Sequence, residues 1–275
     1  MLSTLPQELL DYILDYLHDD APALKSCSTA CHAFLLASSY HLFQEVALGR
    51  RLRSPTSEVL RHFASTVEAS PRLRMHIRGL SLAPPLRVRR SHKDSGLALD
   101  LRVLRDALEA LPSLHTIDLR YVQIELCDQP VLPLACTHLK KVVLGAVLHP
   151  EPSKLRDVLV LLLDVRLDSL EVIGQWTEPQ SPIPHEHRSR LQISRLSFDE
   201  RNPDASGHCL MALGAFVNPN SLLELRIALQ NPMTIPHVND FLRLGFPKMQ
   251  TLHLDLTECL QSCTGNVIMC TLANG

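Results

Sequence analysis

The chain has 275 residues, a formal net charge of −2 at pH 7, 4% aromatic residues and a leucine content of roughly a fifth. A net charge close to zero gives no overall attraction to nucleic acid or to an acidic membrane, so neither is an expected partner. No apolar run reaches the ~18 residues that a membrane-spanning helix needs. The start of the chain carries Glu8 and Asp11 and is unlike a secretory signal. We therefore expect a cytoplasmic or nuclear protein with reduced cysteines.

The first 48 residues contain three groups of apolar residues at helical spacing, which predict three short helices. Pro6 suits the first turn of a helix because its missing N–H would have no partner there, and Asp20 with Pro22 marks a second helix start. The groups are Leu5, Leu9, Leu10, Ile13, Leu14 and Leu17; Leu24, Cys27, Cys31 and Phe34; and Leu36, Tyr40 and Phe43. A unit this short cannot hide so much apolar surface by itself. The excess must meet the rest of the chain or another protein.

Residues 3–48 carry a longer motif, which consists of Leu5-Pro6-x-Glu8-Leu9-Leu10-x-x-Ile13-Leu14-x-x-Leu17, then Leu24-x-x-Cys27-x-x-x-Cys31-x-x-Phe34, then Leu42-Phe43. These residues give the segment a resemblance to an F-box. It implies docking on the Skp-type adaptor of a cullin–RING ubiquitin ligase, with the remainder of the chain selecting a protein substrate. The residues that the resemblance assigns to the adaptor are Leu5, Pro6, Leu9, Leu10, Ile13, Leu14, Leu17, Leu24, Cys27, Cys31 and Phe34.

After a predicted helix at residues 56–69, the pattern apolar-x-x-apolar-x-apolar recurs along the chain. It occurs at residues 77–82, 114–119, 139–144, 193–198, 222–227 and 249–254, and in a weaker form as Leu170-x-x-Ile173. The last two apolar residues of each copy lie two apart, so they point to the same side of a short strand. Successive copies are 23 to 37 residues apart, mostly near the period of roughly 20–29 residues that leucine-rich repeats show.

Between the predicted strands, apolar residues return to helical spacing near residues 101–111, 155–162, 210–216 and 238–242. Alternating strands and helices imply a parallel sheet with right-handed crossovers. We therefore expect an α/β fold in which a three-helix F-box at residues 3–48 precedes an irregular leucine-rich-repeat solenoid at residues 49–275. A chance leucine pattern in an unrelated α/β domain is the alternative.

Three segments depart from the repeat. Residues 83–97 and the proline-rich residues 177–190 are predicted insertions, which are expected to form exposed loops. The tail at residues 258–275 lacks the polar closing helix of a terminal repeat. That absence predicts a truncated or mis-spliced C-terminus, or an array whose remainder is missing.

No catalytic signature is present. The chain has no G-x-S-x-G motif, no phosphate-binding glycine loop and no H-E-x-x-H motif, so we expect neither enzyme activity nor a cofactor. Two groups could be imagined as metal ligands, namely His185 with His187, and Cys259, Cys263 and Cys270. A zinc site needs four ligands, usually in two closely spaced pairs, and neither group provides them. No metal is predicted.

Two sets of residues are candidates for contacts with a partner. The first is a cluster of basic residues that contains no acidic residue: Arg72, Arg74, Arg78, Arg87, Arg89, Arg90 and Lys93. Such a cluster suits an acidic or phosphorylated partner, although a solvated insertion is the simpler interpretation. The second set lies beside the core leucines of the predicted strands: Asp118, Arg120, Ser197, Asp199, Arg226, His253 and Asp255. Trp176, the only tryptophan, is a further candidate because tryptophan is enriched in binding hot spots.

The resemblance and these patterns together predict the substrate-recognition subunit of a Skp–cullin–F-box ubiquitin ligase. Its partners would be the Skp-type adaptor and a protein substrate. The competing hypothesis is a ligase-independent interaction scaffold, whose first helices simply cap the solenoid.

Overall fold

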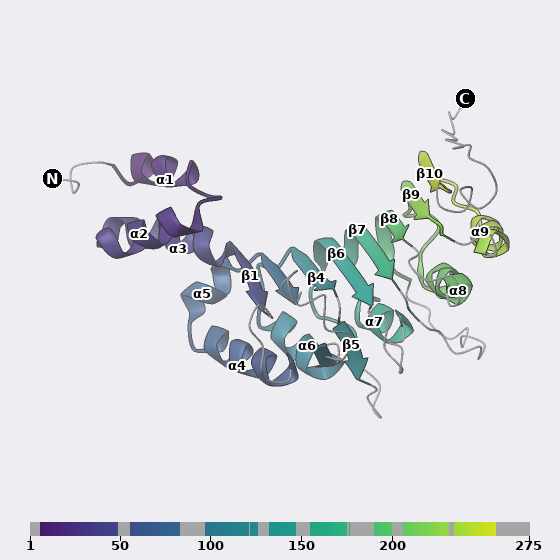
Figure 1. The fold of residues 1–275 in the computed structure, drawn as a ribbon, viewed down its shortest axis with the longest axis horizontal. Helices are drawn as coiled ribbons and strands as arrows, with labels where there is room; N and C mark the ends of the chain where they lie inside the picture. The colour runs from purple at the N-terminus through teal and green to yellow at the C-terminus, as the bar shows by residue number, and fades with distance from the viewer. Residues whose placement is uncertain are drawn as a thin grey trace.

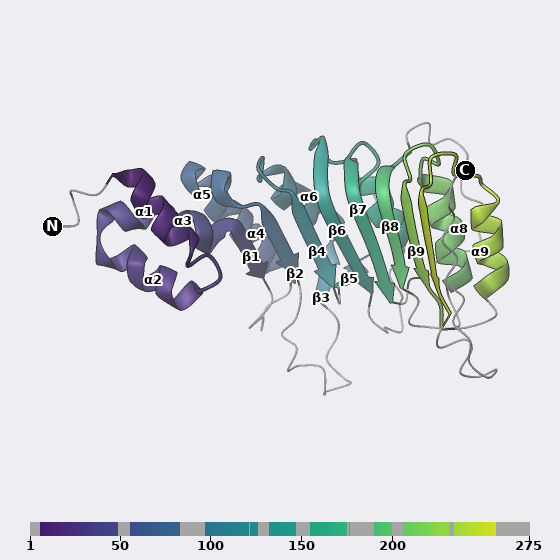
Figure 2. The same ribbon diagram turned by 90° about the horizontal axis from the view of Figure 1, so that it is seen from above.

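The computed structural model of the protein describes residues 6–48, 56–82, 97–120, 122–125, 132–146, 155–174, 176, 190–199, 206–230 and 234–256. In this part of the chain, a unit of three helices at the N-terminal end leads directly into a long parallel sheet (Figure 1). Helices from the crossovers cover one face of the sheet, and the opposite face carries no helix among the described residues (Figures 1 and 2). The expected α/β class, with alternating strands and helices, is confirmed.

The N-terminal unit consists of α1 (Gln7–Asp15), α2 (Ala21–Ala30) and α3 (His32–Gln44). The predicted helix start at Asp20 is confirmed, because its side chain accepts a hydrogen bond from the N–H of Ala23 at 2.9 Å. The second predicted apolar group is divided between two helices. The backbone of Cys31 is extended and ends α2, so Phe34 belongs to α3. Both α1 and α2 pack on α3.

The main sheet contains eight parallel strands in the order β1-β2-β4-β6-β7-β8-β9-β10. These are β1 (Glu45–Leu48), β2 (Gly79–Leu82), β4 (Thr116–Arg120), β6 (His138–Ala146), β7 (Arg166–Gly174), β8 (Gln192–Asp199), β9 (Glu224–Ala228) and β10 (Thr251–Asp255). Each strand of this sheet pairs with the one before it in the chain, so the sheet grows in one direction. This arrangement is typical of a solenoid.

The crossovers supply the helical layer, which contains α4 (Thr56–Glu68), α5 (Pro71–His76), α6 (Leu101–Glu109), α7 (Leu155–Leu161), α8 (Ser206–Phe216) and α9 (Ile235–Leu242). A short parallel pair, β3 (Leu97–Asp100) and β5 (Val122–Glu125), was not predicted. The Ser57 hydroxyl in α4 accepts the N–H of Asp100 at 3.1 Å. The Asp100 side chain in turn caps α6.

The core is a continuous apolar layer between the sheet and the helices. Each strand contributes two inward side chains, and the strand register aligns them in two rows. The rows are Val46, Leu80, Ile117, Val142, Leu170, Leu196, Leu225 and Leu252, and Leu48, Leu82, Leu119, Leu144, Val172, Phe198, Ile227 and Leu254. From β2 to β9 every member is at most 4% exposed. The members in β1 and β10 are more exposed, because neighbouring strands shield them on one side only.

The predicted pattern at β7 is wrong by three residues. The register pairs Leu170, and not Ile173, with Val142. The copy in this strand is therefore Leu167-x-x-Leu170-x-Val172, and Ile173 faces away from the helices. With this correction the steps from 142 to 170 and from 170 to 196 become 28 and 26 residues, which makes the spacing more regular than the sequence indicated.

One copy of the pattern was missed. Phe43-x-x-Val46-x-Leu48 fits the pattern, and β1 pairs with β2 through Val46 and Leu80. Its first residue, Phe43, also belongs to the apolar group at residues 36–43, whose spacing predicts the third helix. The structure explains both patterns, since α3 ends at Gln44 and β1 begins at the next residue.

The corrected register gives a stability prediction for Leu170 and Ile173. Leu170→Ala empties a fully buried site in the apolar layer and should cost about 2–5 kcal/mol. Ile173→Ala, three residues away on the partly exposed opposite face, should cost about 1 kcal/mol or less. Denaturant unfolding of both variants measures the difference. An equal or larger loss for Ile173→Ala would contradict the corrected register.

Candidate protein-binding surfaces

Helix α1 carries two apolar stripes on different faces. Leu10 and Leu14 are 2% and 0% exposed, and they form the inner stripe, which packs on α3. Leu9, Tyr12, Ile13 and Tyr16 follow the spacing i, i+3, i+4, i+7, which places them together on a second face. They are 49%, 59%, 47% and 71% exposed, respectively. An exposed apolar stripe of this kind is unusual on a monomeric protein surface.

The residues assigned to the adaptor by resemblance occupy three environments. Leu10, Leu14 and Leu24 are buried inside the helical unit. Leu17, Cys27, Cys31 and Phe34 are partly buried, Pro6 is exposed with Leu9 and Ile13, and Leu5 lies outside the described residues. The interior residues stabilise the unit itself, and only the exposed members are on its surface. Tyr12 and Tyr16 were not predicted, because the apolar group expected at this helix contained leucine and isoleucine alone.

Helix α3 adds further apolar surface and supports α1. Leu35, Leu36 and Phe43 are 40%, 49% and 41% exposed. His41 Nε2 lies 3.0 Å from a carboxylate oxygen of Asp15, and the imidazole is only 10% exposed. This contact joins α3 to the C-terminal end of α1. The orientation of the exposed α1 stripe is thus fixed by packing on its inner face and by a polar contact at its end.

The helical unit is connected to the sheet through a tight junction. The N–H of Arg78, just before β2, donates to the carbonyl oxygen of Gln44 at 2.9 Å. The guanidinium of Arg78 lies over the ring of Tyr40 at 5.2 Å, a favourable cation–π arrangement. Tyr40 also contacts the His76 ring edge to face, with centroids 5.7 Å apart. These contacts hold the end of α3 against the turn that leads into β2.

Most of the residues predicted to bind a substrate lie on the face of the sheet opposite the helices. Strand register aligns Asp118, Ser197, Arg226 and His253 in one row across the sheet. The next row contains Arg120, Asp199 and Asp255. We call this polar surface the open face. Within the main sheet, these residues lie on β4, β8, β9 and β10, and none of them lies on β6 or β7.

Those two middle strands contribute an ion pair that sequence reasoning missed. Lys141 on β6 and Glu171 on β7 are 3.2 Å apart, and Glu171 occupies the position equivalent to Asp118 and Ser197. Correct alignment of the β7 pattern would have identified it. Asp118 and Arg120 also pair on the open face, with the Arg120 Nε 2.9 Å from a carboxylate oxygen. Arg120 lies over Gly145, where a Cβ atom would come within 3.0 Å of its Cγ.

Trp176 does not belong to this surface, which corrects the prediction. It is 2% exposed, and its indole N–H donates to the carbonyl oxygen of Ile173 at 3.2 Å. The buried thiol of Cys209 donates to the Trp176 carbonyl oxygen at 2.9 Å. Trp176 therefore anchors the chain after β7 to α8, and it is not available to a partner.

Two carboxyl groups on the sheet have shifted pKa values. Partial burial raises the pKa of Glu45, whose carboxylate lies over Gly79. At Asp168, a hydrogen bond from His138 at 2.9 Å lowers the pKa, and the positive charges of Arg166 and Arg195 act in the same direction. Asp168 is therefore surrounded by cationic side chains at the beginning of β7.

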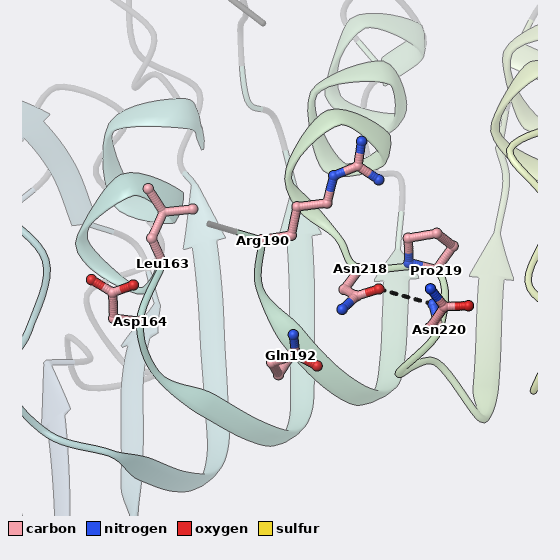
Figure 3. A pocket seen from close by; sticks show the side chains of 7 residues that line it. All are labelled: Leu163, Asp164, Arg190, Gln192, Asn218, Pro219 and Asn220. Atoms are coloured by element: carbon pink, nitrogen blue, oxygen red, sulfur yellow. Dashed lines mark hydrogen bonds between the residues drawn. The ribbon is translucent and has the colours of Figure 1, made fainter. Parts of the chain in front are cut away.

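A hollow of about 530 Å³ lies beside the start of β8, where α7 leads back to β7 and α8 leads back to β9. Leu163 and Asp164 line one side of it, Asn218, Pro219 and Asn220 line the other, and Arg190 and Gln192 lie between them (Figure 3). The lining is mostly polar and contains no nucleophile paired with a base. It offers contacts to polar groups and no arrangement for bond chemistry.

The remaining chemical predictions concern metals, membranes and the basic cluster. Across the described ranges, no group of three or more potential ligands could hold a metal ion, and no helix is long and apolar enough to cross a membrane. The histidine pair at 185 and 187, the tail cysteines and the basic residues from 87 to 93 lie outside the described residues.

Comparisons with known proteins do not add a family. No protein-family model matches the chain, and a search of curated proteins finds no relative.

The contact between His138 and Asp168 gives a prediction about pH. In a ¹³C NMR titration, Asp168 should titrate below the ordinary value of 3.8, and His138→Ala should raise its midpoint. Because the folded pKa is lowered, the contact stabilises the fold above the pKa of an unfolded aspartate and is lost as the pH falls through the folded pKa. The effect on stability should be small, because the pair is exposed.

His253→Ala serves as the matched control, since it removes an exposed imidazole from β10, three strands away in the same sheet. It should leave the Asp168 midpoint unchanged. An Asp168 midpoint at or above 3.8 in the unmodified protein would contradict the assigned contact.

Proposed function

We propose that the protein is the substrate-recognition subunit of a Skp–cullin–F-box ubiquitin ligase. In this proposal, the N-terminal helical unit binds the Skp-type adaptor and the open face of the sheet binds a protein substrate. The observation that carries the proposal is the second apolar stripe of α1, formed by Leu9, Tyr12, Ile13 and Tyr16, because a folded chain does not need it for its own core.

The size of the exposed apolar surface supports a reversible complex. Covering the exposed half of an aliphatic side chain contributes on the order of 1 kcal/mol, so Leu9, Ile13, Leu35 and Leu36 together contribute roughly 4 kcal/mol. This only reaches the lower end of the association cost of about 4–15 kcal/mol. Each tyrosine exposes on the order of 100 Å² and adds about 2–3 kcal/mol. Useful affinity therefore requires Tyr12 and Tyr16 as well as the aliphatic residues.

The competing scaffold hypothesis expects the helical unit to cap the sheet. A cap would lay its apolar residues on the open edge of β1. In the structure α1 and α2 pack chiefly on α3, and α3 alone of the three makes substantial contacts with α5 and β1. Figure 1 shows the unit extending beyond the end of the sheet. This arrangement favours a binding unit over a cap.

A receptor of this type performs no bond chemistry. It holds its substrate close to the catalytic module of the ligase and so raises the local concentration of the reacting groups. The tight junction between Arg78, Gln44 and Tyr40 fits this role, because it keeps the adaptor surface and the open face in a fixed relation.

Adaptor binding is tested with Leu9→Asp combined with Ile13→Asp. The double change places two charges in the exposed stripe and should abolish co-purification of the full chain with a Skp-type adaptor. Because both side chains are about half exposed, the melting temperature should change little. Co-purification and circular dichroism measure the two effects.

The matched control is Met211→Asp combined with Leu244→Asp, which alters two side chains of similar exposure at the other end of the molecule. It should leave adaptor binding intact. If the unmodified protein does not bind the adaptor, or if the α1 variant unfolds, the scaffold hypothesis is the better explanation.

A further inference from the structure

Basic residues recur along the edge at which the strands begin, which we call the start edge of the sheet. The N–H of His115 donates to the carbonyl oxygen of Arg78 at 2.7 Å, and the N–H of Lys140 donates to that of His115 at 2.7 Å. These bonds place the three residues side by side at the starts of β2, β4 and β6. Arg166 on β7 pairs in register with His138 on β6 and continues the same edge.

The charge is most concentrated around the start of β7. Asp168 lies in the field of Arg166 and Arg195, so both cations are close to its carboxylate. Lys140 on β6 lies next to Asp168 on β7, because the residues before them (139 and 167) and after them (141 and 169) are paired in register. Arg190, beside the hollow, extends the charge toward β8 (Figure 3).

These cations have no acidic partner among the described residues. No carboxylate there lies within 4.0 Å of a side-chain nitrogen of Arg78, Lys140, Arg166, Arg190 or Arg195, although other cations of the sheet, such as Lys141 and Arg120, are paired. We name these five residues the basic strip. Carboxylates interrupt it: Asp168, which already pairs with His138, Asp164 at the hollow, and Glu224, which is in register with Arg195 on the neighbouring strand β9.

We infer that the basic strip binds an acidic segment of a protein, with glutamate, aspartate or phosphorylated side chains. Arginine forks suit carboxylate and phosphate groups, and unpaired exposed cations give up no existing ion pair when they bind one. The inference rests on the proposed function in one respect, which is that the segment belongs to a ligase substrate.

The geometry sets the length of the segment. From β2 to β8 the strip crosses four strand spacings of about 4.8 Å, which gives about 19 Å. An extended chain covers this distance in about six residues at ~3.3 Å each. Every second side chain of an extended peptide lies on the same side, so acidic residues at alternate positions would all face the strip.

A nucleic acid fits the strip less well. Tyr40, the aromatic ring under Arg78, is already packed against that guanidinium and against His76, so it offers no free face for base stacking. Asp164 and Asp168 would repel a continuous phosphate backbone, whereas a peptide can place neutral residues opposite them.

The test is fluorescence anisotropy with the full chain and three labelled peptides of about ten residues. The first alternates glutamate with serine, the second carries glutamine in place of glutamate, and the third carries phosphoserine in place of glutamate. We expect the glutamate and phosphoserine peptides to bind, with an affinity that falls as salt rises, and the glutamine peptide to fail. The stronger of the two binding peptides identifies the preferred anion.

Charge reversal locates the site. Lys140→Glu, Arg166→Glu and Arg195→Glu combined should weaken binding by about tenfold or more, since one lost charge-assisted hydrogen bond already corresponds to about that factor. The control combines Lys25→Glu, Arg61→Glu and Lys248→Glu, three exposed cations away from the strip, and should preserve binding.

The inference is overturned if neither acidic peptide binds at low salt, or if both triple variants lose binding equally. It is also overturned if a single-stranded DNA of equal charge binds as tightly as the peptides and is released by the same charge reversal. None of these measurements involves the adaptor, so their failure is separate from a failure of adaptor co-purification.

Discussion

The structure depends on one constraint, which is that two side chains of every strand must enter a shared apolar layer beneath the sheet. Parallel strands about 4.8 Å apart bring these pairs into contact only when all strands keep the same register. The rows that include Leu80 and Leu82 satisfy this condition across the sheet. The residues between and beside these apolar pairs face outward and do not pack in the apolar layer, so their side chains can differ from strand to strand. The polar open face is a consequence of the apolar layer.

The sequence predicted much of this layer because its signal is local. An apolar pair two residues apart identifies a half-buried strand, and the six clear copies of the pattern all fall on strands. The error at β7 has a physical cause. Leu170 fits both the first and the fourth position of the pattern, and Ile173 is apolar although it faces outward. Only the pairing with β6 and β8 distinguishes the two alignments, and the sequence of one strand does not determine how it pairs with its neighbours.

The candidate surfaces were predictable to a different degree. The outward position of Arg226 could be predicted because the pattern of its strand was aligned correctly. Glu171 was not predicted as an outward residue, because the pattern of β7 was aligned three residues too late. Trp176 shows the limit of residue type as evidence, because its burial depends on α8, which comes later in the chain. The same limit applies to α1. Leu9 and Leu10 are neighbours of one chemical type, and their opposite environments are set by the position of α3.

The strand β1 links these surfaces into one molecule. Its first residue follows the last residue of α3, and it is the first member of the apolar layer. Any rotation of the helical unit would therefore break the bond between Arg78 and Gln44 and would also strain the first strand pair. The residue that closes this junction, Arg78, is also the first cation of the basic strip. A segment bound along the strip would lie next to the helical unit at that end, so the proposed adaptor surface and the proposed substrate surface meet at a junction whose geometry the sheet itself maintains.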